Sequence, residues 1–337
     1  MAKIAQNFSA LVGNTPLIEL ASLSRLTGAR ILGKAEFMNP GGSVKDRAAL
    51  SIVNEAEKAG LLTPGKGVIV EGTAGNTGIG LTLVGNERGY QTIIVMPNNQ
   101  AREKIELLQT LGADVRLVPP APFANQANYY HVARELAKNT PGAFWANQFE
   151  NTANADAHFA GTGREIWDET DGALDIFVTS AGTGGTIGGV SAYLAERNPT
   201  IESYLVDPTG SGLYNYITTG EFKAEGSSIT EGIGINRLTQ NFARGNLKGA
   251  LQASDQEAVD ICHYLAKHEG IFIGSSAGLN VAGAVKLAKK NGAGKTIVTI
   301  LCDGGGRYQS KLYNPAWLAE QKLTPRVVDR SWYEALS

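Results

Sequence analysis

One lysine stands out because of the residues around it. Lys45 lies in Asn39–Arg47, with sequence NPGGSVKDR, directly before an apolar helical pattern. Gly41 and Gly42 let the backbone adopt positive φ and approach a ligand closely. Ser43 can cap the helix, which places Lys45 in the first turn, where the helix dipole disfavours a cation. The position therefore suits an amine that is neutral or bound as an imine to a carbonyl compound. A surface lysine that merely opens a helix is the simpler interpretation of this segment alone.

Two glycine-rich turns could bind anions. The first, EGTAGNTG, spans residues 71–78, and the second, SAGTGGT, spans residues 180–186. Each follows a predicted strand and opens a predicted helix, so main-chain N–H groups and the helix dipole would face the anion. The first turn suits a carboxylate, and its Asn76 could bond a phenolic oxygen. The second suits a phosphate, although it is neither a P-loop nor a dinucleotide fingerprint. A plain strand-to-helix turn is the alternative for both.

A third glycine-rich segment, TILCDGGGRY, covers residues 299–308 at the carboxyl end of a predicted strand. Open α/β sheets bind ligands at this end of their strands, so a polar side chain here could meet a heterocyclic nitrogen. Asp303 as an ordinary turn residue before glycines is the alternative. Gln148 could be an amide near the site or a solvated loop residue, and His158 is expected to pack or cap rather than react.

The elements that must position these residues alternate between strand and helix, as in a parallel α/β sheet. Strands are expected within residues 11–20 and at 31–36, 67–71, 92–96, 114–118, 175–179, 203–207 and 296–301. Helices are expected at 46–60, 78–87, 101–111, 126–138, 158–170, 185–197, 254–268 and 276–291. The alternation restarts after residue 155, which predicts two blocks with a cleft between them. Residues 208–250 are expected to be irregular and to form a mobile wall of that cleft.

Composition and charge exclude several classes of protein. With 337 residues, 43% of them hydrophobic, the chain can bury a large core divided between two domains. A net charge of −2 with scattered basic residues provides no positive field for nucleic acid. The two cysteines, Cys262 and Cys302, exclude a disulfide framework, lack metal-ligand spacing and favour a reducing compartment. Without a signal peptide or a membrane-spanning apolar run, a soluble cytoplasmic enzyme is expected.

Taken together, the motifs resemble the cysteine synthase (O-acetylserine sulfhydrylase) and cystathionine β-synthase family of fold-type II pyridoxal-phosphate enzymes. VGNTPL at residues 12–17, PGGSVKDR, TxGNTG, NQFEN, GTGGT and EGIG occur in the family's order and at similar spacing. The resemblance implies two doubly wound open-sheet α/β domains, as in the tryptophan synthase β-subunit, with the active site in the cleft between them. It implies a smaller mobile domain over residues 40–155 and a larger domain of residues 1–39 and 156–337.

The resemblance also implies pyridoxal 5'-phosphate as cofactor, no metal, and roles for individual residues. Lys45 would form the internal aldimine and then act as base or acid at the substrate Cα. The cofactor would be held by Lys45, Asn76, Gly182, Thr183, Gly184, Gly185 and Thr186. The substrate would be held by Thr73, Ala74, Gly75, Thr77, Gln148 and Gly232, mostly through its carboxylate.

Two positions depart from the family pattern. Ala74 stands where the family usually has serine, so one hydroxyl near the substrate carboxylate is missing. The family usually presents a serine to the pyridine nitrogen, and here Asp303 or Gly304 is expected to take its place. A carboxylate of Asp303 facing the ring would keep that nitrogen protonated and strengthen the electron sink. A bridging water is the alternative.

The predicted reaction is β-replacement on O-acetyl-L-serine by sulfide, which gives L-cysteine and acetate through an aminoacrylate intermediate. One alternative is cystathionine β-synthase chemistry with L-serine and L-homocysteine, or another β-replacement or β-elimination on serine or cysteine derivatives. A dehydratase is disfavoured, because its lysine usually lies in Ser-Phe-Lys. A non-catalytic relative that only binds a ligand is a remote alternative. The resemblance implies a homodimer, and some family members bind the C-terminal tail of serine acetyltransferase in the active site.

Overall fold

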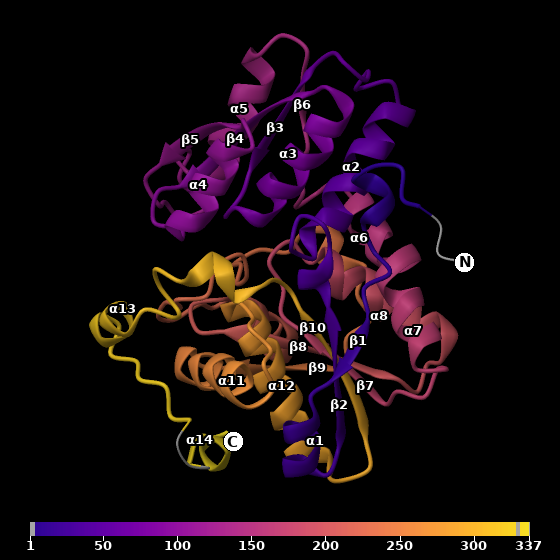
Figure 1. The fold of residues 1–337 in the computed structure, drawn as a ribbon, viewed down its shortest axis with the longest axis vertical. Coiled ribbons are helices and arrows are strands. Elements are labelled where there is room, and N and C mark those ends of the chain that lie inside the picture. The colour runs from indigo at the N-terminus through magenta and orange to yellow at the C-terminus, as the bar shows by residue number, and fades with distance from the viewer. Residues whose placement is uncertain (1–3, 328–330, 337) are drawn as a thin grey trace.

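The computed structural model describes residues 4–327 and 331–336, which form two β-sheets flanked by helices (Figure 1). The smaller sheet is parallel and has the strand order β5 (Asp114–Val118), β4 (Gln91–Pro97), β3 (Val68–Gly72), β6 (Ala143–Trp145). The larger sheet has the order β1 (Leu17–Glu19), β2 (Arg30–Ala35), β10 (Thr296–Leu301), β7 (Ile176–Thr179), β8 (Glu202–Pro208), β9 (Gly249–Ala253). Its strands are parallel except for β1, which pairs antiparallel with β2.

The helices of the first half are α1 (Ala21–Thr27), α2 (Lys45–Lys58), α3 (Asn76–Arg88), α4 (Arg102–Thr110), α5 (Tyr129–Asn139), α6 (Ala153–Ala157) and α7 (Arg164–Glu169). Those of the second half are α8 (Gly185–Arg197), α9 (Leu213–Thr219), α10 (Gln240–Ala243), α11 (Asp255–His268), α12 (Ser275–Asn291), α13 (Pro315–Glu320) and α14 (Ser331–Ala335). Short 3₁₀ turns lie at η1 (Ser9–Leu11), η2 (Glu36–Met38) and η4 (Gly305–Tyr308), and a π-helical turn lies at η3 (His158–Gly163).

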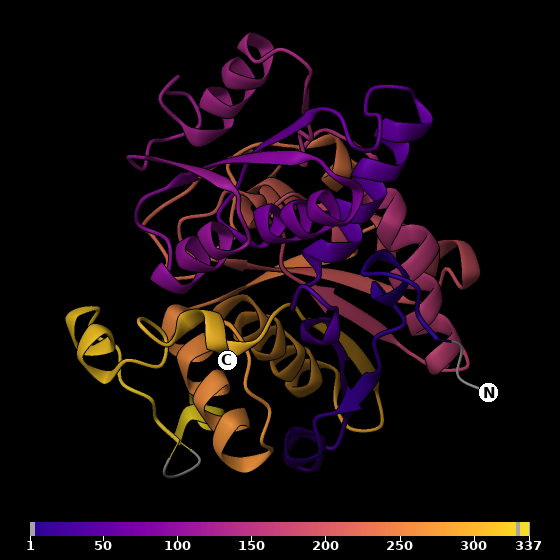
Figure 2. The same ribbon diagram turned by 45° about the horizontal axis from the view of Figure 1, so that its top comes forward.

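The chain leaves the larger sheet and returns to it. Figures 1 and 2 show the violet part of the chain building the upper body, whereas the indigo N-terminal segment joins the orange and yellow C-terminal half in the lower body. The predicted α/β class with two open sheets is confirmed. The domain boundaries at residues 40 and 155, and the mobility of the smaller domain, stay predictions.

Several predicted elements need correction. The expected helix at 158–170 consists of two pieces, the π-helical turn η3 and the helix α7, and it directly continues α6, where the chain packs on α8. The approach is close: a Cβ on Gly163 would lie 2.9 Å from the Tyr193 Cβ, and one on Gly189 would lie 2.2 Å from the Ala155 carbonyl oxygen. Residues 208–250, expected to be irregular, contain α9 and α10 and the start of β9. The short strand β6 was not predicted.

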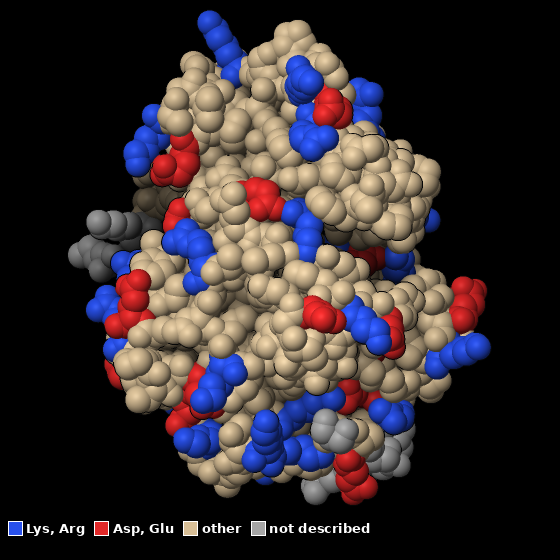
Figure 3. Space-filling view, turned by 180° about the vertical axis from the view of Figure 1, so that it is seen from behind, with Lys and Arg blue, Asp and Glu red and all other residues tan. Residues whose placement is uncertain are grey.

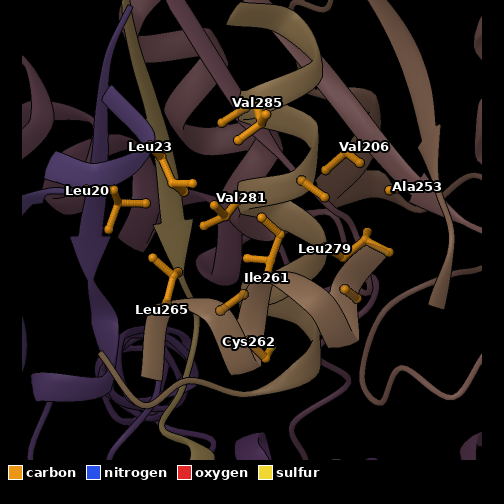
Figure 4. Close-up of a cluster of buried hydrophobic side chains, with 14 of the residues drawn as sticks. Leu20, Leu23, Val206, Ala253, Ile261, Cys262, Leu265, Leu279, Val281 and Val285 are labelled. Atoms are coloured by element: carbon orange, nitrogen blue, oxygen red, sulfur yellow. The ribbon is translucent and has the colours of Figure 1, made fainter. Parts of the chain in front are cut away.

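The largest buried cluster lies between the larger sheet and the pair α11 and α12 (Figure 4). Val281 and Val285 of α12 point toward the sheet, and Ile261 and Leu265 of α11 pack beside them. A second cluster covers the other face of the sheet beneath α8. With both faces covered, the central strands are mainly apolar, and Ile176–Thr179 is buried at every residue. This rigid sheet supports the loops at its carboxyl edge.

A buried ion-pair network ties α2 to the larger sheet. Arg47 Nε lies 2.8 Å from a carboxylate oxygen of Glu36, and its Nη2 lies 2.7 Å from Glu165. Lys34 lies 2.9 Å from Glu165 and also pairs with Glu169. Burial alone would raise the pKa of Glu165, but Arg47 and Lys34 outweigh it and hold that pKa at about 2. The network fixes the helix that begins at Lys45.

The face seen in Figure 3 carries scattered acidic and basic side chains separated by wide uncharged areas. Across the described residues, no helix is both long enough and apolar enough to cross a membrane.

Candidate active site

A cavity of about 230 Å³ is lined by residues from the bodies of both sheets. Its lining consists of Val44, Lys45, residues 73–77, Pro97, Gln100, Lys104, Tyr129, Gln148, Phe149, Gly182, Thr183, residues 230–235, Ser276 and Cys302. Most of these residues lie on loops that follow a parallel strand, which is where open α/β sheets bind ligands. The lysine turn and parts of both predicted anion-binding turns therefore meet in one place.

Lys45 is the first residue of α2, as the sequence predicts, and its turn is pinned by main-chain contacts. Gly41 N–H donates to the Asp46 carboxylate at 2.6 Å, and Val44 N–H donates to the Cys302 carbonyl at 2.8 Å. The Ser43 hydroxyl accepts from Lys45 N–H at 3.2 Å. Desolvation lowers the pKa of the Lys45 amine, against the opposing effect of nearby acidic groups. Among the described residues the amine has no hydrogen-bond or ion-pair partner, so it is free for chemistry.

The turn at residues 73–77 has an extended network behind it. Gly75 adopts φ +132° at the start of α3, and its N–H donates to the Thr73 hydroxyl at 3.1 Å. The Thr77 hydroxyl donates to Gln148 Oε1 at 2.6 Å, and Gln148 Nε2 donates to the Gly72 carbonyl at 3.1 Å. Gln148 is therefore part of the cavity wall, held by the turn that it faces.

The turn at residues 182–186 requires its glycines. A Cβ on Gly182 would lie 2.0 Å from the Gly232 carbonyl oxygen, and Gly184 adopts φ +84° against Phe242. Gly185 is equally confined, because a Cβ there would lie 2.0 Å from Asn154 Oδ1. The turn opens α8, so its main-chain N–H groups lie at a helix N-terminus.

Only part of this turn lines the cavity. Gly182 and Thr183 do so, whereas Gly184, Gly185 and Thr186 are not in the lining. The Thr186 hydroxyl lies 3.3 Å from Nε2 of His158, whose Nδ1 lies 2.9 Å from the Thr162 hydroxyl. His158 is buried, and desolvation lowers its pKa well below the usual range, so it is a neutral packing residue beneath the turn, as predicted.

Asp303 does not face the cavity, contrary to prediction. Its Oδ2 accepts from the Asn76 amide at 2.7 Å and from the Tyr308 hydroxyl at 2.7 Å. Its Oδ1 is packed so closely on Gly274 that a Cβ there would lie 2.2 Å away. Neither Asp303 nor Gly304 lines the cavity. The carboxylate instead orients Asn76, whose Oδ1 accepts from Arg307 at 2.6 Å.

The side chains that line the cavity in this region are Ser276 and Cys302. Ser276 lies in the first turn of α12, where sequence reasoning expected a helix to begin but assigned no function. The sequence feature that could have indicated Ser276 is its position: its hydroxyl lies at the start of a helix that follows Gly274 and the buried Ile273. Cys302 is held by the Asn280 amide at 3.3 Å, and burial raises the pKa of its thiol to about 11.

A buried ion pair joins the two bodies at another side of the cavity. Lys104 of α4 lies 2.7 Å from Glu231, whose carboxylate also accepts from Ala101 N–H at 3.0 Å. Lys311 lies 2.6 Å from the same carboxylate. Burial alone would raise the pKa of Glu231, but Lys104 and Lys311 hold it below its usual value. Sequence reasoning singled out the Gly232 segment but missed this pair, whose members are 127 positions apart.

Comparison with known proteins identifies the family. The family model described as pyridoxal-phosphate dependent enzyme matches residues 8–303. The chain belongs to this family. It is 49% identical over 330 residues to a cysteine synthase of Dictyostelium discoideum, covering 95% of this chain and 87% of the relative. It is 50% identical over 317 residues to cysteine synthase 1 of Emericella nidulans, covering 93% and 85%.

Solved structures of this family of pyridoxal-phosphate dependent enzymes superpose well on the chain. The O-acetylserine dependent cystathionine beta-synthase of Helicobacter pylori has a TM-score of 0.84 at 33% identity, covering 92% of this chain and 99% of that one. A hydrogen sulfide-producing enzyme of Fusobacterium nucleatum has a TM-score of 0.82 at 32% identity, covering 91% and 99%.

The residues present fit the family's cofactor. A cavity-lining amine with a lowered pKa and no partner among the described residues suits a covalent link to an aldehyde. Gly182, Gly184 and Gly185 have no space for a side chain, so the turn exposes main-chain N–H groups that can bind a phosphate. Within the described residues, no group of three or more His, Cys, Asp or Glu side chains could hold a metal ion.

Proposed function

We propose that this protein synthesises L-cysteine and acetate from O-acetyl-L-serine and sulfide by β-replacement. The observation that carries the proposal is the unpartnered amine of Lys45, among the residues described, in a cavity between a carboxylate-type turn and a phosphate-type turn. Relatives named cysteine synthase that are 49–50% identical over most of the chain support the choice of reaction.

The cavity residues divide into two groups under this proposal. Lys45, Asn76, Gly182, Thr183, Gly184, Gly185 and Thr186 hold pyridoxal phosphate, and Thr73, Ala74, Gly75, Thr77, Gln148 and Gly232 surround the amino-acid substrate. The cofactor, when bound, draws electrons from the substrate Cα and makes its proton acidic. The Lys45 amine is the group that takes this proton and later returns it, because desolvation favours its neutral form. Closure of residues 40–155 over the cavity excludes water from the reacting centre.

Ser276 replaces Asp303 and Gly304 as the proposed partner of the pyridine nitrogen. It supplies a hydroxyl to the cavity lining, whereas Asp303 is bonded to Asn76 and Tyr308. A hydroxyl can donate to or accept from the ring nitrogen without imposing a charge on it. Substitution Ser276→Ala should therefore shift the cofactor's visible absorption, and Asp303→Asn should act only indirectly, through Asn76 and Tyr308.

A second candidate function differs in the thiol. The Helicobacter pylori structure is titled an O-acetylserine dependent cystathionine beta-synthase, which names the same first substrate. Homocysteine in place of sulfide would give cystathionine by the same β-replacement. Apart from Lys45, which is assigned to the cofactor, the described residues of the 230 Å³ cavity offer no unpaired lysine to a second carboxylate, because Lys104 and the nearby Lys311 are both paired to Glu231. Sulfide is therefore the preferred second substrate.

We also propose that the protein is a homodimer in the cytoplasm that can bind the C-terminal tail of a serine acetyltransferase. A relative in Saccharomyces cerevisiae is named a putative mitochondrial cysteine synthase, so location needs its own measurement. Light scattering after size-exclusion chromatography tests the dimer, fractionation tests the location, and titration with a tail peptide tests the partner.

The function is tested with purified protein loaded with pyridoxal phosphate. Borohydride reduction followed by mass spectrometry should place the cofactor on Lys45, and Lys45→Ala should abolish both the link and turnover. The exposed Lys58, at a helix end, is the matched control and should not matter when changed to Ala. O-acetyl-L-serine with sulfide should yield L-cysteine, and with homocysteine much less cystathionine. A wild-type protein that binds the cofactor but makes neither product refutes the proposal.

A further inference from the structure

Tyr129 lies at the edge of the carboxylate turn without an assigned role. It is the first residue of α5 and lines the cavity. Its main chain touches the end of β3, because a Cβ on Gly72 would lie 2.7 Å from the Tyr129 carbonyl oxygen. Gly72 directly precedes the turn at residues 73–77. The main chain of Tyr129 is therefore fixed next to the turn proposed to hold the substrate carboxylate, at a position that lines the cavity.

The hydroxyl of Tyr129 has no hydrogen-bond partner among the residues that the structure describes. Its neighbour differs, because the Tyr130 hydroxyl donates to Asn147 at 3.3 Å. Desolvation, reinforced by Glu71, raises the pKa of Tyr129 to about 12. The phenol thus keeps its proton at neutral pH and can donate it to an anion.

Donors for a carboxylate are scarce at this turn. The Thr77 hydroxyl donates to Gln148, and the Gln148 amide donates to Gly72 and Glu71. Ala74 has no hydroxyl. A carboxylate has about four lone-pair positions to satisfy, so main-chain N–H groups and Thr73 leave room for another donor.

We propose that Tyr129 is a substrate-binding residue whose hydroxyl donates to the α-carboxylate of the amino-acid substrate, in place of the hydroxyl that Ala74 lacks. The inference rests on the proposed function in one respect, namely that residues 73–77 bind a carboxylate. Under this proposal, positions 74 and 129 supply the same hydrogen bond: with serine at position 74, that hydroxyl could donate to the carboxylate instead of Tyr129.

The experiment compares two ligands that differ only in the carboxylate. L-alanine and ethylamine are titrated into the cofactor-loaded protein, and binding is followed by the change in cofactor absorption. Tyr129→Phe should weaken L-alanine about 10- to 100-fold, as expected for a lost hydrogen bond to a charged group, and leave ethylamine within about twofold. Adding Ala74→Ser to Tyr129→Phe should restore much of the affinity. Tyr204→Phe is the control and should match wild type, because the Tyr204 hydroxyl bonds Glu202 outside the cavity.

Three results overturn the proposal. Unchanged affinity for L-alanine in Tyr129→Phe excludes the contact, and equal weakening of both ligands indicates a packing role. A higher KM for O-acetyl-L-serine with unchanged L-alanine binding would place the hydroxyl on the acetyl group. Failure of the wild-type protein to make L-cysteine counts against the proposed function alone, because the alanine and ethylamine comparison needs no turnover.

Discussion

The carboxylate of Glu231 binds α4 to residues 230–235, which line the cavity, so its charge should contribute to the stability of the fold. Three donors meet it: Lys104 at 2.7 Å, Lys311 at 2.6 Å and Ala101 N–H at 3.0 Å. The substitution Glu231→Gln keeps the size of the side chain and removes the charge. Lys104, which is 1% exposed, is then left as a buried cation without an anion among its described contacts.

The size of the effect follows from the burial. Removing one partner of a buried ion pair costs about 3–5 kcal/mol, because the remaining charge is uncompensated. Lys104 keeps its bond to the Tyr308 hydroxyl at 3.0 Å and lies 4.3 Å from the centre of that ring. A cation over an aromatic ring is worth about 0.5–2 kcal/mol, but this contact exists already in the wild type and only limits relaxation. Lys311 is 20% exposed and can turn to solvent. We expect Glu231→Gln to lower the free energy of unfolding by about 2–4 kcal/mol.

Urea unfolding of the cofactor-free protein, followed by both tryptophan fluorescence and circular dichroism, measures this value. Lys104→Met and the double variant Lys104→Met with Glu231→Gln complete a mutant cycle, which isolates the pair from its surroundings. The double variant should be more stable than the sum of the single changes predicts, because removing both charges leaves no isolated cation. The pair Lys248 and Glu202, 3.7 Å apart with side chains 63% and 38% exposed, is the control, and Lys248→Met should cost less than about 0.5 kcal/mol.

The reasoning is refuted if Glu231→Gln lowers the free energy of unfolding by less than about 0.5 kcal/mol, since a buried lysine without a counter-charge is expected to destabilise the fold by more than that. Strict additivity in the cycle would also refute it, because it would show that Lys104 and Glu231 do not act on one another in the folded state.

Three further predictions concern acid groups and a glycine. Burial raises the pKa of Glu71 to about 8, so its carboxyl is neutral below that pH and becomes an anion above it. Because this anion would lie near the proposed carboxylate site, the KM for the amino-acid substrate should rise above pH 8 in the wild type. In Glu71→Gln the KM should stay constant over the same pH range. The pKa of Glu165, at about 2, lies below its usual 4.5. Its carboxylate therefore contributes up to about 3 kcal/mol of stability above pH 4.5, and this contribution is lost as the pH falls toward 2. Between pH 4.5 and 2 the free energy of unfolding of Glu165→Gln should depend less steeply on pH than that of the wild type. Gly182→Ala should weaken cofactor binding more than about tenfold, because its Cβ would meet the Gly232 carbonyl. A titration of the cofactor-free protein with pyridoxal phosphate, followed by protein fluorescence, measures this. Gly306→Ala, with no atom within 4 Å of the added Cβ, is the control and should bind the cofactor as wild type does.

Local patterns were enough to find the elements that the turns depend on. The strands at 114–118 and 296–301 and the helix at 185–197 lie within the predicted bounds, because each has clear periodicity and a glycine or polar boundary. The strand β6 has three half-buried residues and, within the described part of the chain, pairs with β3 alone, so its sequence has no alternating pattern. The π-helical turn at 158–163 arises from close packing on α8, which no local pattern contains.

The candidate site was predictable where one short segment carries it, and not where distant segments combine. Lys45, Gly182 and Thr183 each belong to a turn whose sequence indicates its conformation. The placement of Asp303 failed for a different reason: its acidity suggested a ligand contact, whereas folding turned it toward Asn76 and Tyr308. Ser276 and Tyr129 reach the cavity from helices far apart in the chain, and only the packing of α12 and α5 brings them there.

These contacts explain how two separate sheets can make one chemical site. Asn76 lies at the start of α3, beside the smaller sheet, yet its amide is oriented by Asp303 and Arg307, which follow the last strand of the larger sheet. The same Asp303 accepts from Tyr308, whose hydroxyl accepts from Lys104 of α4, and Lys104 in turn pairs with Glu231 over the cavity.

The order of these groups has a physical consequence. Apart from the bond between Asp303 and Tyr308, the hydrogen bonds in the series cross between the two bodies. Separating the bodies would therefore break several charge-assisted bonds together rather than one at a time. An open form must therefore supply water to Lys104, Glu231 and Asp303 at once. A ligand that contacts both the turn at 73–77 and the turn at 182–186 favours the closed form, because it adds its own contacts to bonds that already span the cavity.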